Sequence, residues 1–130
     1  MAVATMGVTV LDCPNPRELA EFYAAVLDWK IEAGDESAGE DGDEWVDLVG
    51  PDGQKLAFQR SEGYQPPIWP STDKPQQFHL DLSVPKERLD AAEREVLRLG
   101  ATLLEGDHDG KRNWRVYADP VGHPFCLCAC

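Results

Sequence analysis

The sequence has few basic residues, no long hydrophobic run and no secretion signal. Lys and Arg total 12 against 24 Asp and Glu, so the formal net charge is −12. This charge repels phosphate backbones and anionic membranes, so we expect neither nucleic acid nor a membrane as a partner, although acidity can favour a cationic ligand. No apolar run approaches the roughly 18 residues of a membrane span, and residues 1–5 lack the basic and apolar regions of a signal peptide. We therefore expect a cytoplasmic protein.

Cysteine is also scarce, and its spacing matches no zinc motif. Cys126, Cys128 and Cys130 alternate, so in a strand they would share one face at a spacing of ~6.8 Å. Neither this run nor the distant Cys13 has the spacing of a zinc knuckle. We expect free thiols, buried or terminal, in a reducing compartment.

What the chain does contain is a repeated pattern of strands and helices. After the N-cap residue Asn15 and Pro16, apolar residues recur at helical spacing up to Leu27, which predicts an amphipathic helix. A second helix is expected to begin at Pro85 and to end before Gly100. Period-2 alternation and β-rich runs between turn signals predict the strands. They are expected at residues 7–12, 29–33, 44–49, 55–60, 77–84, 101–105, 113–118 and 124–129, with an acidic loop at 34–43.

The two halves of the chain match each other in detail. Residues 51–58 align with residues 120–127 without a gap. The predicted fold class is α+β, with two β-α-β-β-β modules forming a concave antiparallel sheet cup, because each helix covers one sheet face and leaves the other for a small ligand. We expect one domain over residues 1–130, made of module 1 (6–60), a linker or flap (61–76) and module 2 (77–130).

The predicted strand at 77–84 carries the candidate catalytic residues. The four apolar residues from Phe78 to Val84 fall on one face, whereas His79 and Asp81 share the other. His79 would act as a general base and Asp81 would tune it. Alternate residues of a strand lie ~6.8 Å apart, so Asp81 can act electrostatically without bonding His79. The alternative is a satisfied core histidine beside a solvated aspartate.

The linker at 61–76 holds four prolines together with Tyr64 and Trp69. It is too proline-rich for a helix or a central strand. Because a loop would not leave two large aromatic groups fully exposed, we expect a flap in which Tyr64 and Trp69 form the walls of a ligand pocket. The alternative is a plain connector. Further candidates for the wall and for polar ligand contacts are Trp29, Trp114, Gln59 and Cys126.

These features resemble the vicinal oxygen chelate (VOC) superfamily, which includes glyoxalase I, extradiol dioxygenases, fosfomycin-resistance proteins and bleomycin-binding proteins. The helix entry at residues 15–29, with the pattern Asn-Pro-x-x-Leu-Ala-x-Phe-Tyr, is similar to the first module of that family. Residues 119–125 are similar to the turn before its last strand. The segment 63–70, followed by Gln-x-His-Leu-Asp at 77–81, is similar to a glyoxalase-like subgroup.

The resemblance also implies where a metal would bind. Metal-dependent members place one ligand on the first strand and one on the last strand of each module. Carried onto this chain, the four positions fall on Val8 (or Thr9, if the register shifts by one), Ala57, His79 and Cys126. Valine and alanine offer no lone pair, so we expect no metal cofactor. The alternative is zinc held by His79 and Cys126, with Gln59 as a third ligand.

Two functions are implied. The first is binding of a small organic molecule without a metal, as in the bleomycin-binding branch. The alternative is an enzyme of the lyase or isomerase type, either metal-free with His79 as base or metal-dependent through an atypical His79 and Cys126 site. In both cases we expect a homodimer with two-fold symmetry, because the resemblance implies a cup that two subunits often complete.

Overall fold

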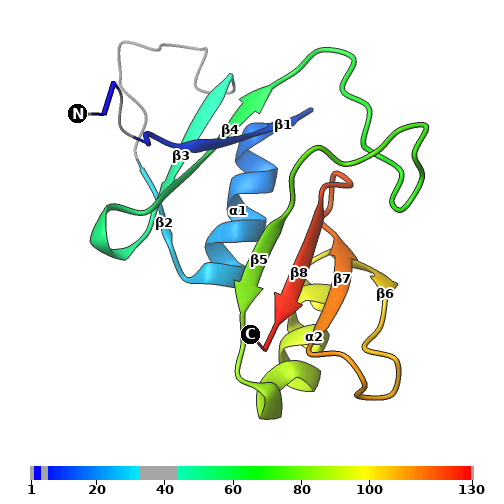
Figure 1. The fold of residues 1–130 in the computed structure, drawn as a ribbon. Helices are drawn as coiled ribbons and strands as arrows, with labels where there is room; N and C mark the ends of the chain where they lie inside the picture. Colours follow the sequence, from blue (N-terminus) through cyan, green and yellow to red (C-terminus); the bar gives the residue numbers. More distant parts are fainter. Residues whose placement is uncertain (1, 4–5, 33–43, 130) are drawn as a thin grey trace. The chain divides into compact units, whose positions relative to one another are not determined.

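The computed structural model describes residues 2–3, 6–32 and 44–129, which form two compact units (Figure 1). The first unit extends to Tyr64 and the second begins at Gln65. Among the described residues, each unit contains one open four-stranded sheet and one α-helix. The predicted α+β class with two β-α-β-β-β modules is therefore confirmed. The predicted acidic loop at 34–43 lies outside the described residues.

The first unit packs one helix against one face of its sheet. Its elements are β1 (Thr9–Cys13), α1 (Pro16–Leu27), β2 (Lys30–Ile31), β3 (Trp45–Val49) and β4 (Lys55–Arg60), and the strand order is β1-β4-β3-β2. Asn15 caps α1 by accepting a hydrogen bond from the Glu18 backbone N–H at 3.3 Å, as its place before a proline predicts. On the buried side of α1, Tyr23 stacks on Phe58 with ring centroids 5.8 Å apart.

The second unit repeats this plan. Its elements are β5 (Leu80–Ser83), α2 (Leu89–Arg98), β6 (Thr102–Glu105), β7 (Trp114–Ala118) and β8 (Pro124–Cys128), and the strand order is β5-β8-β7-β6. Tyr117 and Phe125 stack at 5.4 Å in the core between the sheet and α2. Gly100 follows α2 with φ +117°, the left-handed conformation that favours glycine after a helix.

The pairing of the strands differs from the predicted antiparallel sheet in one respect. In each unit the first and last strands run parallel, β1 with β4 and β5 with β8, while the other pairs are antiparallel. The helix between the first two strands causes this, because it carries the chain across the sheet before the antiparallel strands begin. Local alternation in the sequence does not encode strand direction, so the prediction could not include it.

The opening strand of the second unit is shorter than predicted. We expected strand over 77–84 with Phe78 on the packed face, but β5 begins at Leu80 and Phe78 is 89% exposed. The ladder starts with Leu80 opposite Phe125. Pro124, which precedes Phe125, has no N–H with which to extend it. Phe78 therefore lies outside the sheet.

The start of the second helix and the state of one cysteine also differ from expectation. Pro85 is extended (φ −57°, ψ 142°) and a 3₁₀ turn over Lys86–Arg88 precedes α2, so the helix begins later than predicted. Cys13 and Cys126 are thiols outside any disulfide, as expected. Cys128 is disulfide-bonded, so the expectation of a thiol at this position is wrong.

Neither α1 nor α2, with 12 and 10 residues, has the length and apolar character needed to span a membrane.

Candidate functional site

One face of the second sheet brings His79, Asp81 and Cys126 together. Asp81 on β5 lies opposite Cys126 on β8 in parallel register, so the two side chains leave the same face. His79 precedes β5 and turns its ring back, so that Nε2 lies 3.2 Å from Oδ1 of Asp81. One potential ligand atom from each residue lies within 4.8 Å of the others. Asp81 therefore contacts His79 directly, more closely than the spacing along a strand predicts.

This face points away from α2. On β7, Arg115 and Tyr117 contact carboxylates of α2, so the residue between them, Val116, lies on the opposite face. Val116 is the register partner of Cys126, and both are buried, with 6% and 8% exposure. The side chains of His79 and Asp81 are 41% and 63% exposed. The site thus has an apolar floor and a polar rim that solvent can reach.

The thiol of Cys126 is held in its neutral form. Burial is the main cause, and the negative charge of Asp81 and a hydrogen bond with its carboxylate add to it, so the pKa of Cys126 rises to about 11. A protonated thiol is a weak nucleophile. Without a metal, Cys126 therefore lines the site as a small, neutral group beside Asp81.

The other predicted ligand contacts are distributed over both units. Gln59 is exposed on β4, and Tyr64 is half-buried at the end of the first unit. Trp69 is half-buried in the second unit, and Trp114 is 40% exposed with the Arg112 guanidinium 5.3 Å from its ring centroid. The role of these residues in a pocket stays a prediction. Trp29 has a packing role as well, because a Cβ placed on Gly50 would lie 2.3 Å from its ring.

The segment that joins the modules is attached to the turn before β8. A Cβ built on Gly122 would lie 2.4 Å from Cβ of Pro66, so these two residues are in close contact. Within the segment, the backbone N–H of Ile68 donates to Lys74 O at 2.7 Å, and that of Ser71 donates to Ile68 O at 2.7 Å. The segment is therefore a folded loop with a fixed base, and a flap would have to move above that base.

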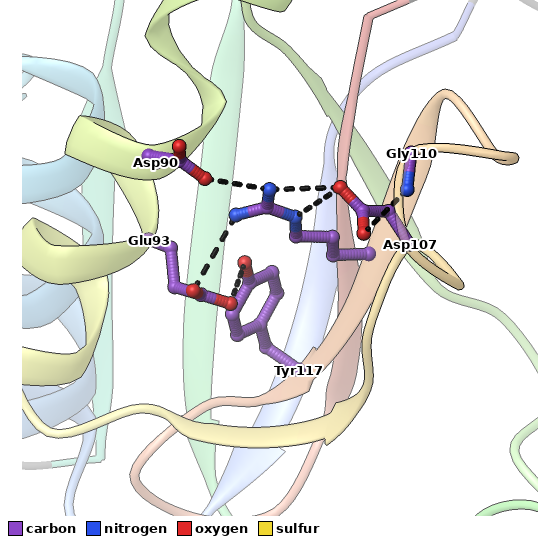
Figure 2. A network of polar contacts seen from close by, with 6 residues as sticks. Asp90, Glu93, Asp107, Gly110 and Tyr117 are labelled. Atoms are coloured by element: carbon purple, nitrogen blue, oxygen red, sulfur yellow. Dashed lines mark hydrogen bonds and ion pairs between the residues drawn. The ribbon is translucent and has the colours of Figure 1, made fainter.

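The residues that the sequence analysis missed form a network around Arg115 on the helix side of the same sheet (Figure 2). Arg115 is 9% exposed. Its Nε and Nη2 donate to Oδ2 of Asp107 at 3.1 and 2.8 Å, and Nη2 also donates to Oδ1 of Asp90 at 2.7 Å. Its Nη1 lies 3.4 Å from Glu93, whose other oxygen accepts from Tyr117 Oη at 3.0 Å. Figure 2 shows these carboxylates converging on one guanidinium from α2 and from the loop before β7.

This network fixes the strand that carries the floor of the site. Asp90 and Asp107 are the main partners that raise the pKa of Arg115, which stays charged, and burial together with Glu93 raises the pKa of Tyr117. The network clamps α2 and the loop of Asp107 to β7, whose opposite face presents Val116. An arginine in the middle of an otherwise apolar strand was the one signal that could have located it.

A shallow depression lies at the far end of β5. It has a volume of about 350 Å³ and is lined by Ser83, Val84, Pro85, Lys86 and Ala129. Its polar side chains are Ser83 and Lys86, and the lining contains no histidine, cysteine or carboxylate that could activate them or bind a metal.

The metal set expected of metal-dependent VOC proteins does not fit these residues. Val10 pairs with Ala57 in the first unit as Asp81 pairs with Cys126 in the second. Because Ala57 aligns with Cys126 in the repeat, Val10 corresponds to Asp81. The residue that corresponds to His79 is then Val8. Two of the four ligand positions therefore have side chains without a lone pair, and no step can be assigned to a metal held by that set.

The fold and this site define a protein of the paired β-α-β-β-β class. Residues 8–128 match the family model of the glyoxalase-like domain, so the chain belongs to this family and to the VOC superfamily that the sequence resembles. Among curated proteins, none matches this chain.

Solved structures share the fold at low sequence identity. The fosfomycin resistance protein FosX from Mesorhizobium loti matches with a TM-score of 0.74 and 12% identity over 99% of this chain and 94% of that one. A glyoxalase/bleomycin resistance protein/dioxygenase family enzyme from Burkholderia phytofirmans matches with a TM-score of 0.69 and 18% identity, over 95% of this chain and 97% of that one. A third match is a mutant FosX from Listeria monocytogenes, which is complexed with Mn(II) and 1S,2S-dihydroxypropylphosphonic acid. Its TM-score is 0.69 and its identity 12%, over 98% of this chain and 91% of that one. At these identities the likeness concerns the fold.

Proposed function

We propose that this protein binds a small organic molecule on the face of the second sheet that points away from α2, without the four-ligand metal centre of metal-dependent VOC proteins. The observation that carries the proposal is the His79–Asp81 pair, 3.2 Å apart, beside the buried thiol of Cys126. Ligand sites in proteins combine an apolar surface with a few convergent polar groups. This face has both.

The chemistry of the residues suggests how a ligand would be held. Val116 and Cys126 offer an apolar floor, and the exposed polar groups of His79 and Asp81 would orient a polar edge of the ligand. The carboxylate and the net charge of −12 favour a ligand that is neutral or cationic over an anionic one. Trp69, which belongs to the same unit, would add an aromatic wall if the linker closes as a flap.

The relatives support a small-molecule role. The Listeria protein named above is complexed with a small dihydroxylated phosphonic acid, and bleomycin resistance appears in the name of the Burkholderia family. We extend to this chain only the class of ligand, a small organic molecule, and neither of the two named compounds.

We also propose a cytoplasmic homodimer, because VOC proteins commonly dimerise. Light scattering that gives a monomer mass at high micromolar concentration would contradict the dimer.

The test uses protein purified from its own host and treated with a chelator. Native mass spectrometry should detect a bound organic adduct, and the released compound should quench Trp fluorescence when it is added back to the emptied protein. His79→Ala and Asp81→Asn should weaken this binding. His108→Ala is the matched control, because His108 also pairs with a carboxylate, Glu105 at 2.9 Å, within the same unit. Equal weakening by the control, or no adduct and no quenching, would contradict the proposal.

A second function is favoured by the same short contact. If a neutral His79 donates its Nε2–H to Asp81, the lone pair of Nδ1 is free to take a proton from a substrate, and Asp81 stabilises the imidazolium that forms. This describes a metal-free lyase or isomerase. General base catalysis contributes roughly 10²- to 10⁴-fold in rate. His79→Ala should therefore lower the turnover rate by about that factor. A compound recovered unchanged after incubation would support the binding function instead.

A further inference from the structure

The group formed by His79, Asp81 and Cys126 contains three different kinds of metal donor. An imidazole nitrogen, a carboxylate oxygen and a thiol sulfur come within 4.8 Å of one another. All three residues belong to the second unit, and two of them are register partners on adjacent strands. The group therefore needs no residue from the first unit, where Val8 and Ala57 stand at the positions of the missing ligands.

We propose that His79, Asp81 and Cys126 form a three-ligand zinc site within the second unit, which adds Asp81 to His79 and Cys126 in place of the ligands missing at Val8 and Ala57. Zinc accepts nitrogen, oxygen and sulfur ligands in one tetrahedral shell, whereas Mg²⁺ and Ca²⁺ prefer oxygen ligands only. Asp81, which has no counterpart in the family's four-ligand set, supplies the third donor. The alternative suggested by sequence contained His79, Cys126 and Gln59, but not Asp81.

The geometry is compatible with one ion after small side-chain rotations. Zinc bonds are about 2.0–2.3 Å long, so ligand atoms of a tetrahedral site lie closer together than the 4.8 Å limit observed here. His79 and Asp81 are already 3.2 Å apart, and both side chains are partly exposed, so solvent leaves room for them to rotate. Cys126 is buried and fixed in β8. The ion would therefore sit above Cys126, with its fourth position open towards solvent.

Binding would exchange one proton and no electrons. Cys126 would bind as the thiolate, its proton would pass to solvent, and the Zn–S bond would form in its place. A site with three protein ligands and one open position is the arrangement that accepts water or another small ligand. Zinc would occupy the His79 nitrogen and the Asp81 carboxylate, so metal-loaded and metal-free protein would offer an organic molecule different polar groups.

The test is a titration of chelator-treated, reduced full-length protein with Zn²⁺ and with Co²⁺. Zn²⁺ should bind with a stoichiometry of one, raise the melting temperature and release a proton. Co²⁺ should give a thiolate-to-metal charge-transfer band. Cys126→Ser should lose the band, and Asp81→Asn should weaken binding by at least about tenfold, as loss of even an outer-shell partner does. Asp81 is exposed, so this second variant keeps the test valid if Cys126→Ser does not fold.

The controls separate this site from other donors of the chain. Cys13→Ser removes the Cys13 thiol of the first unit, and His108→Gln removes the imidazole paired with Glu105. Both variants should bind zinc like the wild type. Absence of the Co²⁺ band in wild type, or its persistence in Cys126→Ser, would overturn the proposal. The organic-ligand function is tested in metal-free protein, so its failure and the failure of the zinc site are distinguishable.

Discussion

Asp81 and Cys126 face each other across the parallel strands β5 and β8, and the negative charge of the carboxylate opposes ionisation of the thiol. Burial and this negative neighbour together keep the thiol protonated at neutral pH, because they raise its pKa to about 11. Together with His79, this pair forms a group of three potential metal ligands, the only such group among the described residues. This relationship allows direct tests that require no ligand.

Replacing Asp81 by Asn should lower the pKa of the Cys126 thiol and speed up its alkylation in metal-free protein. The amide carries no charge that opposes the thiolate. Because burial is the larger cause, the pKa should stay above the value of about 8.5 for an unperturbed cysteine. The measurement is the pH dependence of iodoacetamide labelling at Cys126, read by peptide mass spectrometry. Labelling that is unchanged in Asp81→Asn would show that the carboxylate has no influence on the thiol.

Replacing Arg115 by Met should destabilise the second unit by about 1–3 kcal/mol, because three carboxylates lose their shared cation. The estimate is below that for a fully buried charge pair, since the carboxylates reach solvent. Urea denaturation measures the free energy of unfolding. Arg98→Met is the matched control: it breaks only a surface pair with Glu95, which solvent screens, so it should destabilise the protein much less. Equal effects of the two substitutions would contradict a structural role for the network.

The stabilising effect of Asp107 should depend on pH. Hydrogen bonds from Arg115 and then from the Gly110 backbone N–H hold the pKa of Asp107 below its usual value. A carboxyl group with a lowered pKa in the folded state stabilises the protein above its unfolded pKa of about 3.9 and loses this effect as the pH falls through the folded value. The difference in unfolding free energy between wild type and Asp107→Asn should therefore be largest above about pH 5 and shrink on acidification. A constant difference would contradict this linkage.

Gly122→Ala should destabilise the loop at Pro66 more than Gly110→Ala does. Both glycines have positive φ, +100° and +82°, but an added Cβ meets Pro66 only at Gly122 and finds open space at Gly110. The shared cost of the left-handed conformation is roughly 1 kcal/mol, so the excess at Gly122 reports the clash. Thermal melting compares the two variants. If the excess is real, Pro66→Gly should reduce it in the double variant; no reduction would assign it to another neighbour.

Much of the fold could be predicted from local patterns. The Asn15 cap, the helical spacing up to Leu27 and the Gly100 stop each follow from one stretch of chain, and the structure shows all three. The gap-free repeat of residues 51–58 in 120–127 predicts two copies of one module, which the strand orders confirm. Local prediction failed at Phe78, where alternation continued but the neighbouring strand offered no partner.

The candidate site divides in the same way. Alternation along one segment of the sequence predicts that His79 and Asp81 share a side, and the structure brings them together although His79 lies just before β5. Only the tertiary structure decided that Cys126 would lie opposite Asp81 and that Arg115 would be surrounded by carboxylates of α2 and the loop before β7. Contacts of this kind depend on strand direction and register. These are set by packing of distant segments against a common core, and a shift by one residue would turn each side chain to the other face.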